Sequence, residues 1–208
     1  MAISEKTTTS RRVEIVNACE KLYRTMAFRE ITLKEISEET SFSRPSIYNY
    51  FATKEEIFLA LFEREYDRWN ESLEEIHRGK RALSARALAE KLAKSLAARP
   101  QLLKLLSMNL YDMEASSRLE CLTRFKHSYG KAMENMRRIL LKFRPDMTGR
   151  QICDFIYAFF PFMFGIYPYT EVTEKQKKAM EQAGVDFELS SAKELIFTFV
   201  CNFLNKQQ

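Results

Sequence analysis

Glycine and proline are scarce in this sequence, with five of each among 208 residues. Because β-sandwiches and glycine-rich α/β enzymes need many turn residues, this scarcity argues against both classes. Histidine occurs only at His77 and His127, and neither has metal-ligand spacing around it. The sequence also contains no G-x-S-x-G, G-x-x-x-x-G-K-[ST] or G-x-G-x-x-G motif. We therefore expect no enzyme, no metal site and no cofactor.

Long apolar runs and paired cysteines are missing too. The longest uncharged stretch lies between Asp154 and Glu171 and is interrupted by two prolines, whereas a membrane helix needs about 20 apolar residues. The first residues lack the apolar core of a signal peptide. No cysteines form a C-x-x-C pair, and we interpret them as core residues rather than ligands or disulfides: Cys19, Cys121, Cys153 and Cys201. We expect a cytoplasmic protein with no membrane partner.

Apolar residues recur instead at helical spacing along nearly the whole chain. From residue 10 to residue 27, for example, they trace one face of a helix. The pattern predicts an all-α fold, with an N-terminal helix-turn-helix domain at residues 1–53 and a larger helical domain at 54–208. The expected helices cover residues 10–27, 33–40, 43–51, 53–76, 84–98, 100–113, 116–143, 148–167, 174–182 and 189–206.

Three of these helices, within about 45 residues, have the spacing of a helix-turn-helix. Thr32 and Glu35 stand in a capping-box pattern at the start of the second helix. Ser43 is expected to cap the third helix, which would bury Ile47 and Phe51 on one face. The opposite face is then free to enter a groove of DNA.

Polar side chains on that opposite face suit DNA contacts. Arg44 can bind a guanine edge with two hydrogen bonds, whereas Lys54, at the far end, suits phosphate oxygens. The alternative is that Tyr48 and Tyr50 only cover a small core and that the charges are solvated. Net charge does not decide the question, because residues 1–60 carry nine basic and nine acidic side chains. The acidic pairs Glu38-Glu39 and Glu55-Glu56 are interpreted as solvated helix faces.

The order of residues over about 11–62 resembles the TetR (tetracycline-repressor-like) family. The most specific part is the run Ser43-Arg44-Pro45-Ser46-Ile47-Tyr48-Asn49-Tyr50-Phe51, with Lys54-Glu55 following. The resemblance implies a dimeric transcription factor, usually a repressor that a small ligand releases from DNA. It also implies that DNA is met by the residues at the matching positions: Lys34, Arg44, Pro45, Ser46, Tyr48, Asn49, Tyr50 and Lys54.

Two positions depart from the family pattern. Ala27 stands where a glycine commonly ends the first helix, and Ser41 replaces the usual glycine of the turn. A residue with a Cβ at position 41 would be strained if its φ were positive.

The helices expected near 150–167 and 189–206 are rich in aromatic residues. The first is apolar nearly all round, so it must be buried on every side, partly by its own domain and partly by a partner. We expect these two helices to form the interface of a homodimer; the alternative is a monomer with a thick core. Pro161 either kinks the first of them to couple an effector to DNA binding or bends it around the core.

An apolar or aromatic small molecule would suit the aromatic and sulfur-rich interior. The candidate lining residues are Met108, Tyr111, Met113, Phe125, Tyr129, Phe159 and Met163. Such stripes also occur as plain core, so that alternative stays open. His127 either orients a polar group of the ligand or is an ordinary exposed histidine.

These observations predict a ligand-responsive DNA-binding regulator, most simply a repressor. It would bind a pseudo-palindromic double-stranded operator as a homodimer, with recognition helices about 34–36 Å apart. The competing interpretation is a helical interaction or ligand-binding protein whose DNA domain no longer reads DNA.

Overall fold

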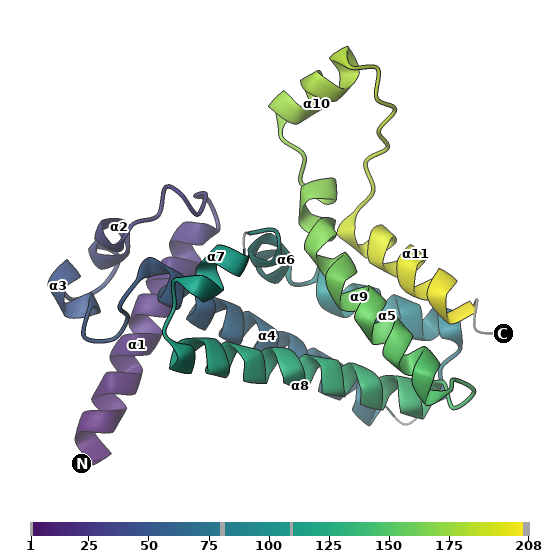
Figure 1. Ribbon diagram of the computed structural model, residues 1–208, viewed down its shortest axis with the longest axis horizontal. Coiled ribbons are helices and arrows are strands. Elements are labelled where there is room, and N and C mark those ends of the chain that lie inside the picture. Colours follow the sequence, from purple (N-terminus) through teal and green to yellow (C-terminus); the bar gives the residue numbers. More distant parts are fainter. Residues whose placement is uncertain (1, 80–81, 109, 206–208) are drawn as a thin grey trace. The chain divides into compact units, whose positions relative to one another are not determined.

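Helices make up all the regular secondary structure of the residues that the computed structural model describes, which are 2–79, 82–108 and 110–205. The predicted all-α fold is confirmed. In chain order the helices are α1 (Ala2–Tyr23), α2 (Leu33–Glu38), α3 (Arg44–Ile47), α4 (Lys54–Arg78), α5 (Ala85–Ala97), α6 (Pro100–Leu106), α7 (Leu110–Ala115), α8 (Leu119–Phe143), α9 (Gly149–Thr170), α10 (Glu174–Gln182) and α11 (Ala192–Asn205) (Figure 1).

Side-chain caps begin several of these helices. The predicted capping box of α2 is present, and the hydroxyl of Thr53 accepts a hydrogen bond of 3.2 Å from an amide in the first turn of α4. Ser43 occupies the N-cap of α3 but makes no capping bond. Its hydroxyl lies 3.1 Å from that of Ser46 instead. The prediction that the Ser43 side chain caps α3 is therefore wrong, because its hydroxyl is paired with the Ser46 hydroxyl and not with a backbone amide.

The segment predicted as one helix over 100–113 forms two, α6 and α7. The backbone amide of Ser107 bonds back to carbonyls of the preceding turn, and its hydroxyl donates to the carbonyl of Lys104 at 2.7 Å. A serine bonded in this way competes with the regular helical pattern. The apolar spacing continues through Ser107, so periodicity did not reveal the break.

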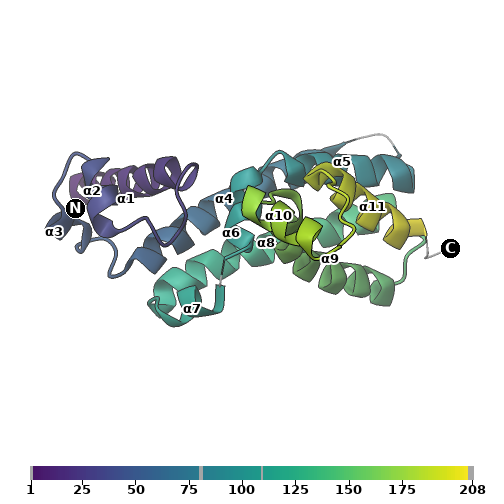
Figure 2. The same cartoon turned by 90° about the horizontal axis from the view of Figure 1, so that it is seen from above.

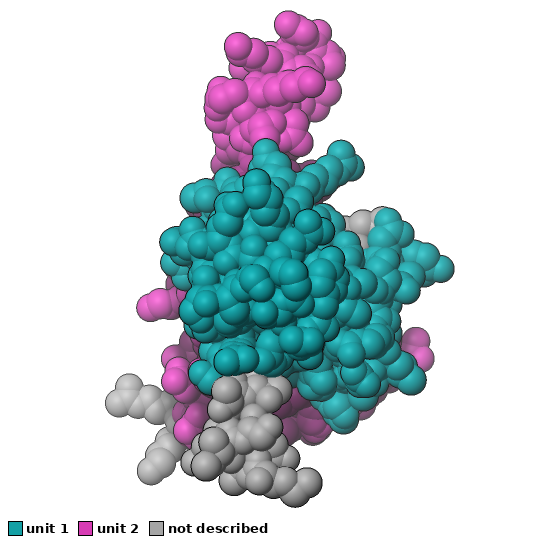
Figure 3. Space-filling model, turned by 90° about the vertical axis from the view of Figure 1, so that its left-hand side faces the viewer, with its two compact units in different colours: residues 1–65, 109–129 teal, residues 66–108, 130–208 magenta. Residues whose placement is uncertain are grey.

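The chain divides into two compact units, one of residues 1–65 with 109–129 and one of residues 66–108 with 130–208 (Figure 3). The first unit is larger than the predicted domain of residues 1–53. It adds the beginning of α4, helix α7 and the beginning of α8. The helix-turn-helix thus shares its unit with a segment that lies far away in sequence.

Aromatic rings pack the core of the first unit. The ring of Phe58 lies edge-on to those of Tyr23 and Phe28, at centroid distances of 5.1 and 4.7 Å. Phe62 of α4 contacts Phe125 of α8 in the same way at 5.1 Å. Edge-to-face pairs of this kind are favourable beyond their burial. These ring contacts join α4 to α1 and to α8 within the first unit.

Trp69 is fully buried in the second unit. Its indole nitrogen donates to the hydroxyl of Ser95 at 3.2 Å, and its ring lies 6.0 Å from that of Phe160. Close by in sequence, Asn70 accepts a hydrogen bond of 3.0 Å from the amide of Asn135, which joins α4 to α8. Figure 1 and Figure 2 both show α11 of the same unit lying along α5 and α9.

Helix α9 has one buried face and one exposed face. The buried face consists of Ile152, Phe155, Ile156, Phe159, Phe160, Met163 and Ile166. The exposed row runs through Tyr157, Pro161, Gly165 and Pro168, and the helix continues through both prolines. By length and composition α9 is apolar enough to cross a membrane, a test that buried core helices also pass. Within a single chain, the row from Tyr157 to Pro168 of this apolar helix therefore remains uncovered.

Candidate nucleic-acid interface

A hydrogen bond to α1 holds the turn between α2 and α3. The backbone amide of Ser41 donates to the carboxylate of Glu14 on α1 at 2.6 Å. No non-glycine residue in the described part of the chain has a positive φ, so Ser41 takes the place of the family's usual glycine without backbone strain. The side chain of Ile36 in α2 and that of Ile47 in α3 are both fully buried beneath the turn.

The recognition segment, which we define as residues 44–51, extends beyond the four residues of α3. The amides of Tyr50 and Phe51 both donate to the carbonyl of Ile47, at 2.9 and 3.0 Å. Ile47 and Phe51 are fully buried, as predicted from their spacing. This anchoring turns the other face of the segment outward.

Most of the predicted DNA-contacting residues belong to this segment, while Lys34 lies on α2 and Lys54 at the start of α4. Tyr48 is 51% exposed, and the Lys34 side chain is 68% exposed at 3.8 Å from Glu38. The others with high exposure are Arg44, Pro45 and Asn49, while Ser46 and Tyr50 are half-buried. Arg44, Tyr48 and Asn49 are thus exposed within one short segment, and a cation, a phenol and an amide are side-chain groups that suit base edges and phosphates.

Two arginines of α1 hold the end of the recognition segment. Arg11 donates to the hydroxyl of Tyr50 at 3.3 Å, and this hydrogen bond raises the pKa of Arg11. Arg12 donates to the carbonyl of Tyr50 at 3.4 Å and lies 4.3 Å from the ring centroid of Phe51. Burial lowers the pKa of the Arg12 guanidinium. Tyr50 is therefore fixed by α1 as well as by its own helix.

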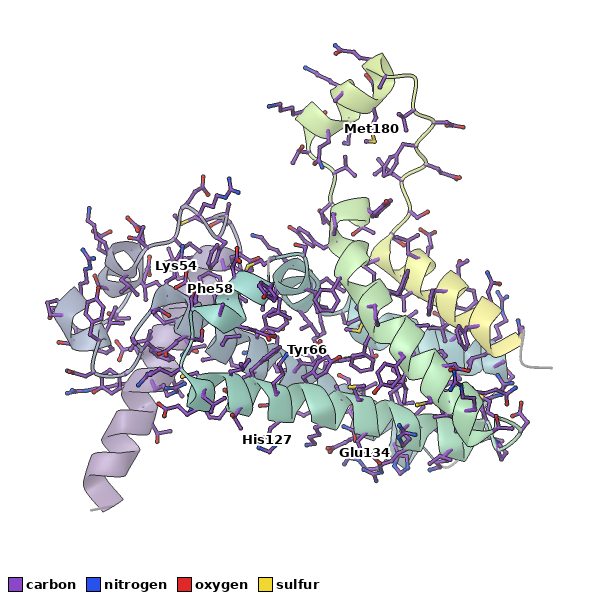
Figure 4. All side chains as sticks on the ribbon, in the orientation of Figure 1. Lys54, Phe58, Tyr66, His127, Glu134 and Met180 are labelled. Carbon is purple, nitrogen blue, oxygen red and sulfur yellow. The ribbon has the colours of Figure 1, made fainter. Side chains whose placement is uncertain are left out.

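Lys54 has an intramolecular partner in addition to its predicted role at phosphate. Its ammonium donates to the carbonyl of Phe28 at 2.8 Å and lies 3.9 Å from the centre of the Phe28 ring. Burial lowers the pKa of Lys54. Figure 4 places Lys54 and Phe58 together at the start of α4. Lys54 thus connects the start of α4 to the loop after α1.

Glu56 and Arg118 are the residues that sequence reasoning missed. The carboxylate of Glu56, only 1% exposed, accepts hydrogen bonds from the Ala52 amide at 2.8 Å and from the Arg118 amide at 3.0 Å. The Arg118 guanidinium adds two more, at 2.6 and 2.7 Å. The interpretation of Glu55-Glu56 as a solvated face is wrong for Glu56, because a cation distant in sequence makes its burial favourable.

The same contact reaches the recognition segment. Arg118 also donates to the carbonyl of Tyr50 at 3.5 Å, and the hydroxyl of Thr53 donates to the carbonyl of Ser116 at 3.3 Å. The turn between α7 and α8 is thereby attached to the end of the recognition segment. Burial by itself would raise the pKa of Glu56, but the bonds from Arg118 and from the backbone amides outweigh it and lower that pKa to about 2.

The predicted effector-lining residues fall in both units. Met113, Phe125 and Tyr129 belong to the first, and the rings of Phe125 and Tyr129 lie 6.4 Å apart. Tyr111, also in the first unit, is 83% exposed. The remaining three, in the second unit, are the half-buried Met108 and the buried Phe159 and Met163.

The other polar candidates are easily placed. His127 is exposed on α8 (Figure 4). Cys19 and Cys121 are buried, and Cys153 and Cys201 are half-buried. Burial raises the pKa of the Cys19 thiol. Among the residues that the structure describes, no group of three or more histidine, cysteine or acidic side chains is placed to hold a metal ion.

Comparison with known families shows which family the chain belongs to. Residues 15–61 match the model of bacterial regulatory proteins of the tetR family, and residues 63–189 match that of the tetracyclin repressor-like C-terminal domain. The chain belongs to the TetR family. It is a DNA-binding transcriptional regulator of the helix-turn-helix type and not an enzyme.

Three known regulators share part of their sequence or their fold with this chain at low sequence identity. The curated regulator YfiR of Bacillus subtilis, an HTH-type transcriptional regulator, is 35% identical over 57 residues, which span 27% of this chain and 28% of that protein. A TetR-family regulator from Mesorhizobium loti has the same fold, with a TM-score of 0.59 and 14% identity over 96% of both chains. FadR of Bacillus subtilis, solved in complex with stearoyl-CoA, gives a TM-score of 0.58 and 17% identity over 92% of this chain and 97% of that one.

Proposed function

We propose that this TetR-family regulator is a ligand-responsive repressor. It binds a pseudo-palindromic operator as a homodimer through its helix-turn-helix, and a small apolar or aromatic effector releases it. The observation that carries the proposal is the outer face of the recognition segment. Arg44, Tyr48 and Asn49 are exposed there, while Ile47 and Phe51 hold the segment from behind.

The uncovered face of α9 supports a dimer. Its exposed row from Tyr157 to Pro168 contains no charged residue, and Tyr157 is 67% exposed. The neighbouring α11 carries no charge after Glu194. Phe199 of α11 stacks on Phe162 of α9 at 4.2 Å, and both rings remain half-exposed. A second copy that covers α9 and α11 would bury this surface, as apolar interfaces of homodimers do.

The dimer is tested by placing a charge on this face. We expect Tyr157→Arg to raise the dimer dissociation constant at least tenfold in sedimentation equilibrium, because it would bury an unpaired charge. Tyr111→Arg is the matched control, since Tyr111 is an exposed tyrosine on α7 of the other unit. A wild-type protein that stays monomeric at micromolar concentration would contradict the proposed dimer.

Release by an effector requires a difference in affinity between two states. A ligand bound among the apolar side chains of the helical domain lowers DNA affinity only if it binds the DNA-incompetent state more tightly. Phe159 and Met163, both buried in the second unit, are proposed as lining residues. Stearoyl-CoA, the ligand of the FadR complex, is a first compound to try because it has a long apolar chain.

Selection of bound fragments from genomic DNA tests the function as a whole. The proposal expects enrichment of a sequence with approximate two-fold symmetry, whose affinity falls steeply as salt rises because phosphate contacts release counterions. Neighbouring genes would then guide the search for the effector. Binding with no sequence preference at any salt concentration would favour the competing class, a ligand-binding protein that has lost DNA recognition.

A further inference from the structure

An arm projects from the second unit between α9 and α11. We define it as residues 171–191; it contains α10 (Glu174–Gln182) and joins the end of α9 to the start of α11. Figure 1 shows α10 standing away from the other helices of its unit, with an extended segment returning to α11. None of the residues of α10 is buried.

The inner side of the arm encloses an apolar hollow of about 450 Å³. Its lining includes Tyr169, Val172, Ala179, Met180, Val185 and Phe187. Met180 lies on the side of α10 that faces the interior of the arm (Figure 4). Tyr169 and Val185 nevertheless remain 63% and 52% exposed. The arm therefore gathers apolar side chains without covering them.

Local structure alone does not account for an ordered arm. Thr173 and Gln176 form a capping box at the start of α10, which satisfies the first amides. However, helices shorter than about 12–15 residues are marginal in water unless an apolar face packs against something else. Because α10 buries no residue in its own chain, another surface has to supply that packing.

The hollow is continuous with the exposed face of α9. Pro168 is the last residue of the exposed α9 row and also lines the hollow. The apolar surface therefore runs from Tyr157 along α9 into the arm without a charged side chain in the row. A small ligand fits the hollow less well, because the only polar side-chain groups among its lining residues are the Gln176 amide and the Tyr169 hydroxyl, and ligand pockets present several converging polar groups.

We propose that the arm of each chain closes over a second copy of the same chain, whose apolar surface fills the hollow. This inference rests on the proposed dimer through α9 and α11. An interface with two-fold symmetry uses the same patch on both copies, so each chain gives one arm and receives one. The arm lengthens the interface beyond α9 and is ordered by it.

Substitution inside the hollow tests the arm separately from the rest of the interface. Met180→Gln keeps the length of the side chain and the helix propensity of α10 but places an amide in the apolar hollow. We expect the dimer dissociation constant to rise at least fivefold in sedimentation equilibrium, and further in Met180→Gln/Phe187→Ala. Lys178→Gln, on the exposed side of the same helix, is the matched control and should leave the constant unchanged.

Hydrogen exchange of residues 174–189 provides a second measurement that does not depend on how strongly one side chain contributes. In the dimer these amides should be protected, and in the Tyr157→Arg monomer they should exchange at least tenfold faster while α5 and the buried part of α9 stay protected. Equal exchange in both states, or an unchanged dissociation constant for the double variant, would overturn the arm proposal and leave the dimer intact. A monomeric wild type would overturn both, and protection that appears only with an added apolar ligand would assign the hollow to that ligand.

Discussion

The buried carboxylate of Glu56 forms an ion pair with the half-exposed Arg118 across 62 positions of sequence. The two side chains share hydrogen bonds of 2.6 and 2.7 Å, and the Arg118 amide adds a third at 3.0 Å. The same guanidinium reaches the carbonyl of Tyr50 at the end of the recognition segment. This pair thus joins the turn before α8 to the recognition segment, within one compact unit.

Removing the charge of Glu56 should weaken both folding and DNA binding. Glu56→Gln replaces charge-assisted hydrogen bonds by weaker ones, and we expect a loss of about 2–3 kcal/mol in the free energy of unfolding. Denaturant titration measures that loss, and a DNA-binding titration of the folded variant measures the second effect. Arg150→Gln, which breaks an exposed pair with Asp154, is the control and should change stability by less than about 1 kcal/mol. A Glu56→Gln protein as stable as this control would show that the pair contributes nothing.

Acid should reveal the same pair. The folded-state pKa of Glu56 is about 2, below its ordinary 4.5, so folding favours the ionised carboxylate. The stabilisation is complete above pH 4.5 and is lost as the pH falls from 4.5 towards 2. We expect the free energy of unfolding of the wild type to decrease more steeply over this window than that of Glu56→Gln. Parallel curves for the two proteins would show that groups other than Glu56 cause the pH dependence of stability.

Arg44 and Lys34 should affect DNA binding in different ways. Arg44→Ala removes a side chain suited to a base edge, and we expect it to lower affinity for the selected operator about 5–100-fold while changing affinity for random DNA much less. Lys34→Ala removes a phosphate contact, so it should weaken both DNAs alike and reduce the salt slope by about one. Binding titrations at several salt concentrations separate the two. Equal losses on both DNAs for Arg44→Ala would exclude a base-reading role.

Lys54 should show a stability effect in addition to any effect on DNA. Lys54→Gln loses the cation over the Phe28 ring and the bond to its carbonyl, and we expect a loss of about 1 kcal/mol in the free energy of unfolding. If the ammonium also meets phosphate, affinity for all DNA sequences falls as well. Thermal unfolding without DNA and binding at fixed salt measure the two effects independently. Wild-type stability with reduced DNA affinity would assign Lys54 to phosphate alone.

Helix-forming segments were largely predictable because their evidence is local. The residues of α10 were predicted without error, and the starts of α2 and α4 followed from Thr32 and Thr53. The break at Ser107 was missed, since it depends on which carbonyls the serine bonds rather than on apolar spacing. Ser43 was misjudged for a similar reason: its hydroxyl has two possible partners, and sequence does not choose between them.

The recognition segment was predictable from the sequence, but the contacts that hold it in place were not. The order from Ser43 to Lys54 identified the recognition segment and its family. It did not show that Tyr50 is held by Arg11 and Arg12, or that Ser41 is held by Glu14. These partners lie 27 to 39 positions away, and no short-range pattern specifies such contacts.

Two adjacent acidic residues show most clearly what the sequence determines and what the tertiary structure decides. From the sequence alone, Glu55 and Glu56 are equivalent polar residues in the first turn of a helix, and that helix is correctly predicted. Tertiary structure makes them different, because it buries the carboxylate of Glu56 and brings Arg118 beside it. The sequence by itself determined the all-helical fold, the family and the recognition segment, since these depend on local order and spacing. The tertiary structure decided which charges are buried and which residues support the recognition segment. An ion becomes stable away from water only when a partner is placed beside it, and the folded chain supplies that partner.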